Sequence, residues 1–218
     1  MTPFPRSPKI LKGGIVLIDP DTSAVKRIIL LQYNPDSLTR TLKGQTLGEG
    51  SDRSQALRLK GPPVETYKLD AEIDAADQLE FPDNNQEVTQ HGISPTLAAL
   101  ETVVYPESSQ LMSNNSLAAS GSLEIIPTES PLMLFVWSKN RILPVRLTDF
   151  SITEEAFDPN LNPIRAKVSL GMRVLSVDDL GFEHKGGSLY MAYQQNKEQL
   201  ANKMKAGVFR SLGIGGIP

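Results

Sequence analysis

The sequence contains no cysteine, which excludes a disulfide framework, a thiolate nucleophile and a zinc–thiolate cluster. Aromatic residues make up only 6% of the 218 residues, too few to suggest the exposed aromatic cluster of a carbohydrate-binding surface. An excess of positive charge is also missing. The formal net charge is −3 and the pI is about 5.5, so the chain offers no overall basic field to nucleic acid.

Long apolar runs are absent as well. No stretch approaches the ~20 apolar residues of a membrane-spanning helix. Residues 1–9 carry charge and proline instead of the apolar core of a signal peptide, and we interpret them as an N-terminal arm. We therefore expect a cytoplasmic protein without direct membrane insertion. A chain without cysteine also suits a reducing compartment.

The residue types that perform catalysis do not form a recognisable site. His91 and His184 are the only histidines, and they lie far apart without metal-ligand spacing. The glycines of 213–216 have no strand before them and no helix after them, so they do not form a phosphate-binding turn. We expect no catalytic, cofactor-binding or metal-binding residues, and hence a protein that is not an enzyme.

Most of the chain has the pattern of β-strands. In the clearest case, apolar residues from Tyr67 to Ala75 alternate with charged residues from Lys68 to Asp74, which predicts one buried and one solvated face. The acidic residues of this strand therefore belong to a solvated face and not to a calcium or carboxylate site. Strands are predicted over 10–18, 25–32, 38–42, 67–75, 123–126, 132–138, 143–155 and 164–175.

Three local features refine this β-rich pattern. The spacing of apolar residues changes parity between Leu147 and Phe150, which predicts a β-bulge. Gly13-Gly14 is a second possible bulge. One internal helix is predicted, with Ser94 as its N-cap and Pro95 in the first helical position.

Three short motifs occur in order along the chain. Tyr33-Asn34-Pro35 separates two strands, Gly61-Pro62-Pro63 opens the alternating strand, and Asp158-Pro159 with Pro163 forms a turn before an Arg-Ala-x-Val-x-Leu strand. Together they resemble the signatures of the tube-type domain of contractile injection systems, which are phage-tail-like machines. The resemblance spans residues 10–175.

The resemblance implies a mainly β fold with one internal helix over 10–177, a two-sheeted barrel or sandwich that closes into a ring. It implies a structural role, in a homo-oligomer expected to be a hexameric ring, which joins the inner tube to the central spike and baseplate. Its partners would be tube, spike and baseplate subunits, within an assembled particle. An inner-tube subunit of the same machine remains an alternative, as does a stand-alone β-sandwich that binds carbohydrate or protein.

The resemblance ends where relatives often carry a LysM module. Here residues 178–218 contain a linker, a predicted helix over 188–206 and a glycine-rich tail. The helix either packs on its own domain or docks on a neighbouring subunit, and we expect docking. The residues proposed for that contact are Leu189, Tyr193, Phe209, Leu212 and Ile214.

The polar, glycine-bearing segment 43–61 has two interpretations. It is either a mobile hairpin tip or an interaction arm, because loops of this length inside compact domains are often functional. We expect Gly48, Asp52 and Arg53 to contact an adjacent subunit or layer.

Overall fold

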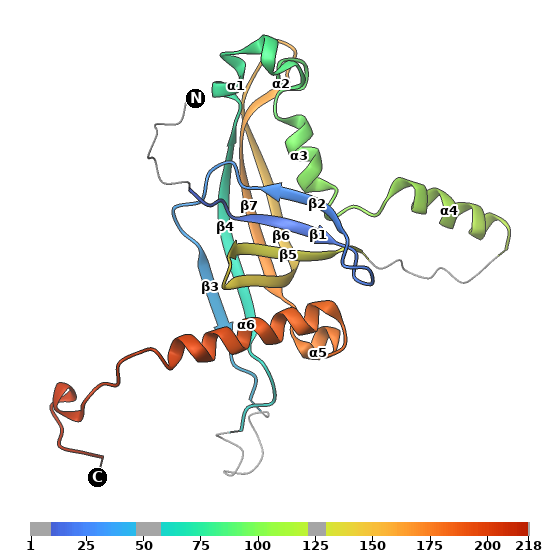
Figure 1. Cartoon of the computed structure of the whole chain (residues 1–218). Coiled ribbons are helices and arrows are strands. Elements are labelled where there is room, and N and C mark those ends of the chain that lie inside the picture. Colours follow the sequence, from blue (N-terminus) through green and yellow to red (C-terminus); the bar gives the residue numbers. More distant parts are fainter. Residues whose placement is uncertain (1–9, 47–57, 122–129, 218) are drawn as a thin grey trace.

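The structure, a computed structural model, describes residues 10–46, 58–121 and 130–217. Its seven strands form one antiparallel sheet in the order β2-β1-β5-β6-β7-β4-β3 (Figure 1). The strands are β1 (Gly14–Ile18), β2 (Val25–Leu30), β3 (Thr39–Lys43), β4 (Val64–Asp74), β5 (Leu132–Ser138), β6 (Arg141–Phe157) and β7 (Pro163–Val174). The expected N-terminal arm and the strand expected over 123–126 lie outside the described residues.

The sheet folds over on itself instead of splitting into two sheets. β6 is 17 residues long and pairs first with β5 and then with β7. Val145 pairs with Met133 on one side and with Val174 on the other, so it is the point at which β6 passes between the two parts. In Figure 1, β1, β2 and β5 cross in front of β4, β6 and β7. The expected two-sheeted barrel or sandwich is thus corrected to one continuous, open sheet, while its closure into a ring with other copies stays a prediction.

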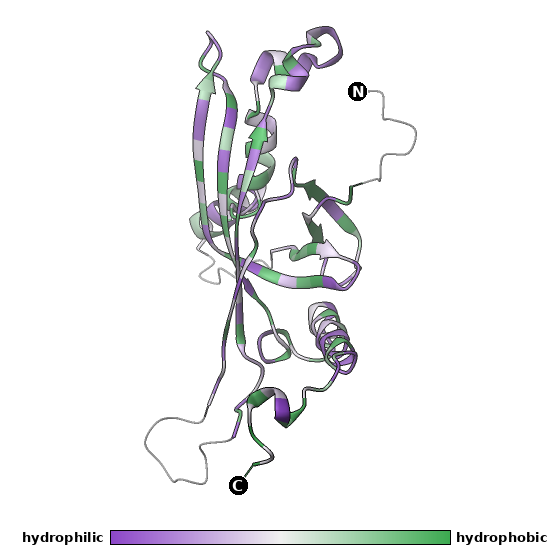
Figure 2. Ribbon diagram, turned by 90° about the vertical axis from the view of Figure 1, so that its left-hand side faces the viewer, coloured by the Kyte–Doolittle hydropathy of each residue, from purple (hydrophilic) through white to green (hydrophobic). Residues whose placement is uncertain are grey.

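The core lies between the two crossing parts of this sheet. The long strands β4 and β7 contribute alternate residues, which the banding of the long strands in Figure 2 illustrates. The predicted faces of β4 and β7 are confirmed, because their alternating apolar residues are buried. The most enclosed members of the core include Ile15, Tyr67, Phe135, Leu143, Val168, Leu170 and Met172.

The predicted bulge in β6 is confirmed. The register between β6 and β7 shifts between Leu147 and Asp149, which lets both Leu147 and Phe150 pack against the core. Gly171 lies opposite the bulge, where an added Cβ would come within 2.9 Å of the Asp149 Cβ. The second suggested bulge is wrong, because the register of β1 shifts at Leu17/Ile18 and not at its glycines.

The expectation of one internal helix is also corrected. Four α-helices lie between β4 and β5 in the described chain. The predicted helix is α3, which starts at Ser94, while Ile93 and not Ser94 is its N-cap. The others were not predicted because α1 and α2 are short and α4 lacks an apolar stripe. The helices are α1 (Ala76–Leu79), η2 (Pro82–Asn84), α2 (Gln86–His91), α3 (Ser94–Glu101), α4 (Ser108–Ala119), α5 (Val177–Leu180), α6 (Lys185–Ala201) and η3 (Phe209–Leu212).

The fold predicts a large difference between two phenylalanines of neighbouring strands. Phe135 is 1% exposed in the core, so Phe135→Ala should lower the free energy of unfolding by about 3–5 kcal/mol. The matched change Phe157→Ala removes a side chain that is 50% exposed and should stay within about 0.5 kcal/mol of the parent. Urea unfolding followed by circular dichroism measures both values. Equal effects would contradict a core between the two crossing parts of the sheet.

Candidate assembly surface

The connection between β2 and β3 is held by Asn34 of the first motif. Its Oδ1 accepts a hydrogen bond from the backbone N–H of Gly13 at 2.9 Å, and its Nδ2 donates to the carbonyl of Leu11 at 2.8 Å. The Asn34 amide therefore provides both an acceptor and a donor for backbone groups of the segment just before β1. Pro35 follows directly and prevents a helix from continuing through Asn34. Tyr33 is 47% exposed.

Gln32, which belongs to none of the three motifs, holds the other side of the same connection by two hydrogen bonds. Its amide donates to the carbonyl of Asp74 at 2.6 Å and accepts from the Asp74 N–H at 2.9 Å. The Asp74 carboxylate forms an ion pair with Arg165 at 2.7 Å. The N–H of Ala76, followed by Arg165, holds the pKa of Asp74 below its ordinary value. β2 and β3, at opposite ends of the sheet, are thus joined by a fixed connection.

The other two motifs also have structural roles. An added Cβ at Gly61 would lie 2.7 Å from the Asp178 carboxylate, so the glycine permits a close approach. The carbonyl of Pro62 accepts a hydrogen bond from the side chain of Gln45 at 2.9 Å. Pro63 is half-buried where β4 begins. This motif fixes the entry of the chain into β4.

Asp158 organises the turn between β6 and β7. Its Oδ1 accepts from the N–H groups of Asn160 and Asn162 at 2.7 and 2.8 Å. A further hydrogen bond from the Asn162 side chain lowers the pKa of Asp158. Pro159 is exposed, whereas Pro163 is buried and its carbonyl accepts from the N–H of Ile93 at 2.8 Å. The turn thereby attaches the start of α3 to the end of the sheet.

The sheet ends in two edge strands, β2 and β3, that have a partner on one side only. Every side chain of β3 is exposed. On β2, Ile28 and Leu30 are 59% and 61% exposed and share the face opposite the buried Ile29. Open edges with exposed apolar side chains favour pairing with another chain.

The outer face of β4, β6 and β7 is polar and carries charges of both signs. Lys167 pairs with Glu155 at 3.0 Å, and Ser169 donates to Asp70 at 2.6 Å. The acidic face predicted for β4 is thus matched by basic and hydroxyl side chains of β7. Exposed pairs of this kind contribute little to stability, so their consequence is a hydrophilic surface of mixed charge.

The C-terminal helix differs from its prediction. α6 begins at Lys185 and not at Ser188, and His184 is its N-cap, with Nδ1 accepting from the Gly186 N–H at 3.0 Å. Its buried face includes Tyr190 and Tyr193, which belong to the core of the sheet. Tyr193 is therefore corrected from an assembly contact to a core residue.

Leu189 also packs on its own domain, although it is only partly buried. It is partly buried against Ile18, Leu132 and Leu134, a small apolar cluster on the other face of the sheet. The proposal that the whole segment from Ser188 docks on a neighbour is consequently wrong for α6. It remains open only for the residues beyond the helix.

A buried carboxylate attaches α6 to β4. Glu65 is 1% exposed, and its Oε1 accepts from the hydroxyls of Tyr67 and Tyr193 at 2.9 and 2.7 Å. Its Oε2 accepts from Lys197 Nζ at 3.0 Å, while Arg40 of β3 lies 3.9 Å from Oε1. Burial, and then the contact between the two tyrosines, raises the pKa of Tyr193. A signal existed in the sequence, because Glu65 has the inward parity of Tyr67.

Two segments project from the body of the protein on different sides (Figure 1). The α4 arm, defined as residues 107–119, has no buried residue in its helix. The C-terminal segment, defined as residues 202–217, is exposed throughout. Phe209, Leu212 and Ile214, three of the expected assembly contacts, lie in it with 48%, 73% and 45% exposure. The three contacts expected in segment 43–61, Gly48, Asp52 and Arg53, lie outside the described residues.

Within residues 10–46, 58–121 and 130–217, no group of three or more His, Cys, Asp or Glu side chains is arranged to hold a metal ion. His91 is exposed, and His184 caps a helix. No helix in the same ranges is long and apolar enough to cross a membrane.

Comparisons with known proteins found no matching protein-family model and no matching curated protein. Among solved structures, the chain is similar to one from the tail of an empty gene transfer agent particle with C6 symmetry. That match has a TM-score of 0.28 and 13% identity and covers 75% of this chain and 90% of the other. A chain from the virion of a native gene transfer agent particle has a TM-score of 0.25 and 11% identity, with coverages of 74% and 90%. TM-scores of this size do not establish a shared fold.

The buried face of α6 predicts that two truncations differ in outcome. A chain ending after Asn202 keeps Tyr190 and Tyr193, so as an isolated monomer it should melt at the same temperature as the full-length monomer. A chain ending after Gly187 loses both tyrosines, each worth about 3–5 kcal/mol of unfolding free energy. It should melt far lower or fail to fold. Thermal melting measures the difference, and equal melting temperatures would show that α6 is dispensable for the core.

Proposed function

We propose that this chain is a non-enzymatic structural subunit of a contractile injection system, forming a ring between the inner tube and the central spike. The resemblance of the three motifs supports the class of machine. Their structural roles add to that support, because all three hold connections that shape the sheet. The ring is expected to be hexameric, with tube, spike and baseplate subunits as its neighbours.

The observation that carries the proposal is the open sheet with an edge strand at each end. When β2 of one copy pairs with β3 of the next, the contact is head-to-tail, and such contacts close into rings when the rotation between copies permits it. Closure also removes the edges that would otherwise promote aggregation. Each copy thus supplies β2 to one interface and β3 to the next.

The polar outer face of β4, β6 and β7 suits the lumen of this ring. Asp70 accepts a hydrogen bond from Ser169, and Lys167 forms an ion pair with Glu155, so acidic, basic and hydroxyl side chains neutralise one another on this face. A surface of balanced charge remains hydrated and offers a passing protein no extended apolar or single-sign patch. A channel for transported material requires these properties.

The position at the tube–spike junction is favoured over a repeated tube layer by the projecting segments. The α4 arm and the C-terminal segment extend well outside the sheet. Such appendages provide separate contacts for the different neighbours that a junction ring has on its two sides.

A single charge on the edge strand tests the ring. Ile28→Lys places a lysine on the exposed face of the edge strand β2, and charged side chains on an edge strand disfavour pairing with a second chain. We expect the variant to keep the circular dichroism spectrum of the folded parent but to change from a ring to a monomer. Light scattering after size exclusion and negative-stain electron microscopy measure the change.

Leu161→Lys is the matched control, because Leu161 is 79% exposed in the turn between β6 and β7, away from either edge strand. It should assemble like the parent. A parent chain that remains a monomer at high concentration, or an Ile28→Lys variant that still forms rings, would contradict the proposed function.

A further inference from the structure

The α4 arm contains a helix that no packing against the rest of the chain stabilises, because none of its residues is buried. Its 12 residues include no charged side chain and no buried one, and Leu111, Met112 and Leu117 are 55%, 70% and 47% exposed. Isolated helices of about this length are marginal in water, because nucleation costs are not recovered without packing. A stable α4 therefore requires a surface that covers its apolar side chains.

The C-terminal segment has the complementary chemistry. It exposes Phe209, Leu212 and Ile214 on and after the short helix η3. Its charges are all positive, because Lys203, Lys205 and Arg210 follow Glu198, the last acidic residue of the sequence. This segment therefore combines apolar side chains with basic ones.

The part of the chain that carries the α4 arm is acidic. Residues 75–138 contain eight acidic residues and no lysine or arginine. Two of these acids, Glu101 at the end of α3 and Glu107 at the N-cap of α4, flank the base of the arm. The α4 arm and the C-terminal segment are thus matched both in exposed apolar surface and in the sign of their charge.

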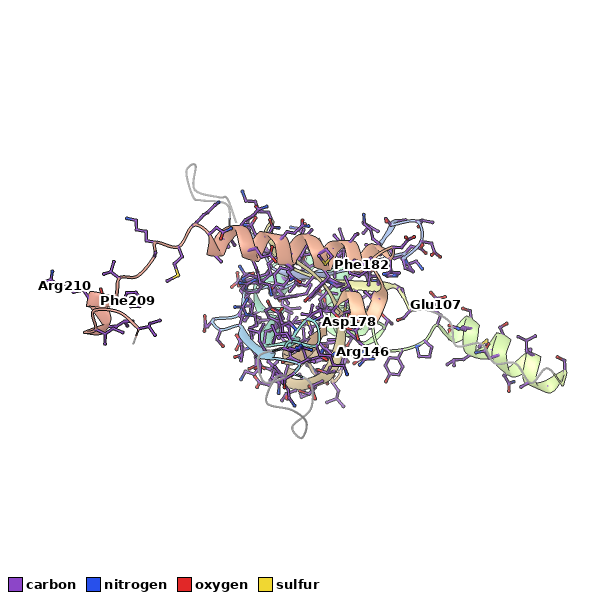
Figure 3. All side chains as sticks on the ribbon, turned by 90° about the horizontal axis from the view of Figure 1, so that it is seen from below. Glu107, Arg146, Asp178, Phe182, Phe209 and Arg210 are labelled. Atoms are coloured by element: carbon purple, nitrogen blue, oxygen red, sulfur yellow. The ribbon has the colours of Figure 1, made fainter. Side chains whose placement is uncertain are left out.

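The two segments do not meet within one molecule. Figure 3 shows Glu107 and the arm on one side of the body, with Phe209 and Arg210 on the opposite side. The arm starts beside an edge strand, because Arg27 of β2 donates a hydrogen bond to Thr102, just after α3, at 2.6 Å. The seven residues 202–208 separate α6 from η3 and span at most ~25 Å when extended. A neighbouring copy is therefore the partner that the arrangement can supply.

We propose that the C-terminal segment of one copy binds the α4 arm of the adjacent copy, with Phe209, Leu212 and Ile214 against the apolar residues of the arm. This contact rests on the proposed ring, which places copies side by side. Lys203, Lys205 and Arg210 then lie close to Glu101 and Glu107 of the neighbour. Each contact is weak because ordering the segment costs entropy, and the ring strengthens it by raising the effective concentration.

Cross-linking tests the contact cleanly, because the chain has no cysteine of its own. Full-length Met112→Cys and Leu212→Cys chains with different tags are co-expressed, purified together and oxidised. We expect a disulfide between the two tagged chains. Replacing Lys203, Lys205 and Arg210 by glutamate in the Leu212→Cys chain should lower the yield of this disulfide by about tenfold. A tenfold change corresponds to about 1.4 kcal/mol of binding free energy.

Charge reversal on the other side should restore the cross-link. Glu101→Lys with Glu107→Lys in the Met112→Cys chain is the rescuing pair. Asp83→Lys with Glu87→Lys is the matched control. It reverses two acids of the same acidic region, Asp83 in η2 and Glu87 in α2. Rescue by the first pair and not by the second supports the contact.

The outcomes separate this inference from the proposed function. Rings in the electron microscope without a disulfide between Met112→Cys and Leu212→Cys overturn the contact and leave the ring intact. Rescue by the control pair alone assigns the segment to a different acidic surface and overturns the contact as well. A parent chain that remains monomeric overturns the ring itself and, with it, the contact.

Discussion

The fold depends on one strand that serves two parts of the sheet. β6 pairs with β5 at its start and with β7 for most of its length, and Val145 forms pairs on both sides. Val145 is 2% exposed, so the transfer between partners occurs inside the core. The bulge that follows it at Leu147–Asp149 keeps apolar residues directed inward as the strand continues. β6 is the strand through which the two crossing parts of the sheet are hydrogen-bonded to each other, so it holds the two edge strands in one continuous sheet.

The helices divide into those that complete this frame and those that leave it. α6 completes it, because the buried Glu65 holds Tyr193 and Lys197 against β4. Removing either partner of such a buried group is costly, since the carboxylate would lose a donor without gaining water. The α4 arm and the C-terminal segment leave the frame and expose apolar side chains. The rigid sheet therefore presents two open edges, and two projecting segments extend from it.

Alternation of apolar and polar residues was sufficient to predict the buried faces of β4 and β7 and the bulge in β6, because these depend on local periodicity. The strand expected over 38–42 forms as β3, but its expected half-buried face is wrong, because every residue of β3 is exposed. It could not predict that the sheet stays open and folds over, because the choice of partner strand is not encoded in either strand alone. Short helices such as α2 escaped prediction because six residues carry little periodic signal. The motifs located three key connections, but Gln32 and Glu65 emerged only when Asp74 and Tyr193, distant in sequence, were seen beside them. The inward parity of Glu65 was the one signal that sequence reasoning could have used.

Pairing of β2 with β3 between copies is most directly tested by a cysteine at each edge. Ile28→Cys in one tagged chain and Thr41→Cys in another place thiols on the exposed faces of the two edge strands, and Thr39→Cys and Lys43→Cys scan the register. Ser151→Cys, exposed in the middle of the sheet, is the control. Oxidation of co-expressed chains should join Ile28→Cys to at least one of the three β3 positions and not to Ser151→Cys. No disulfide at any β3 position, in an oligomer that electron microscopy shows to be assembled, would contradict edge-to-edge assembly.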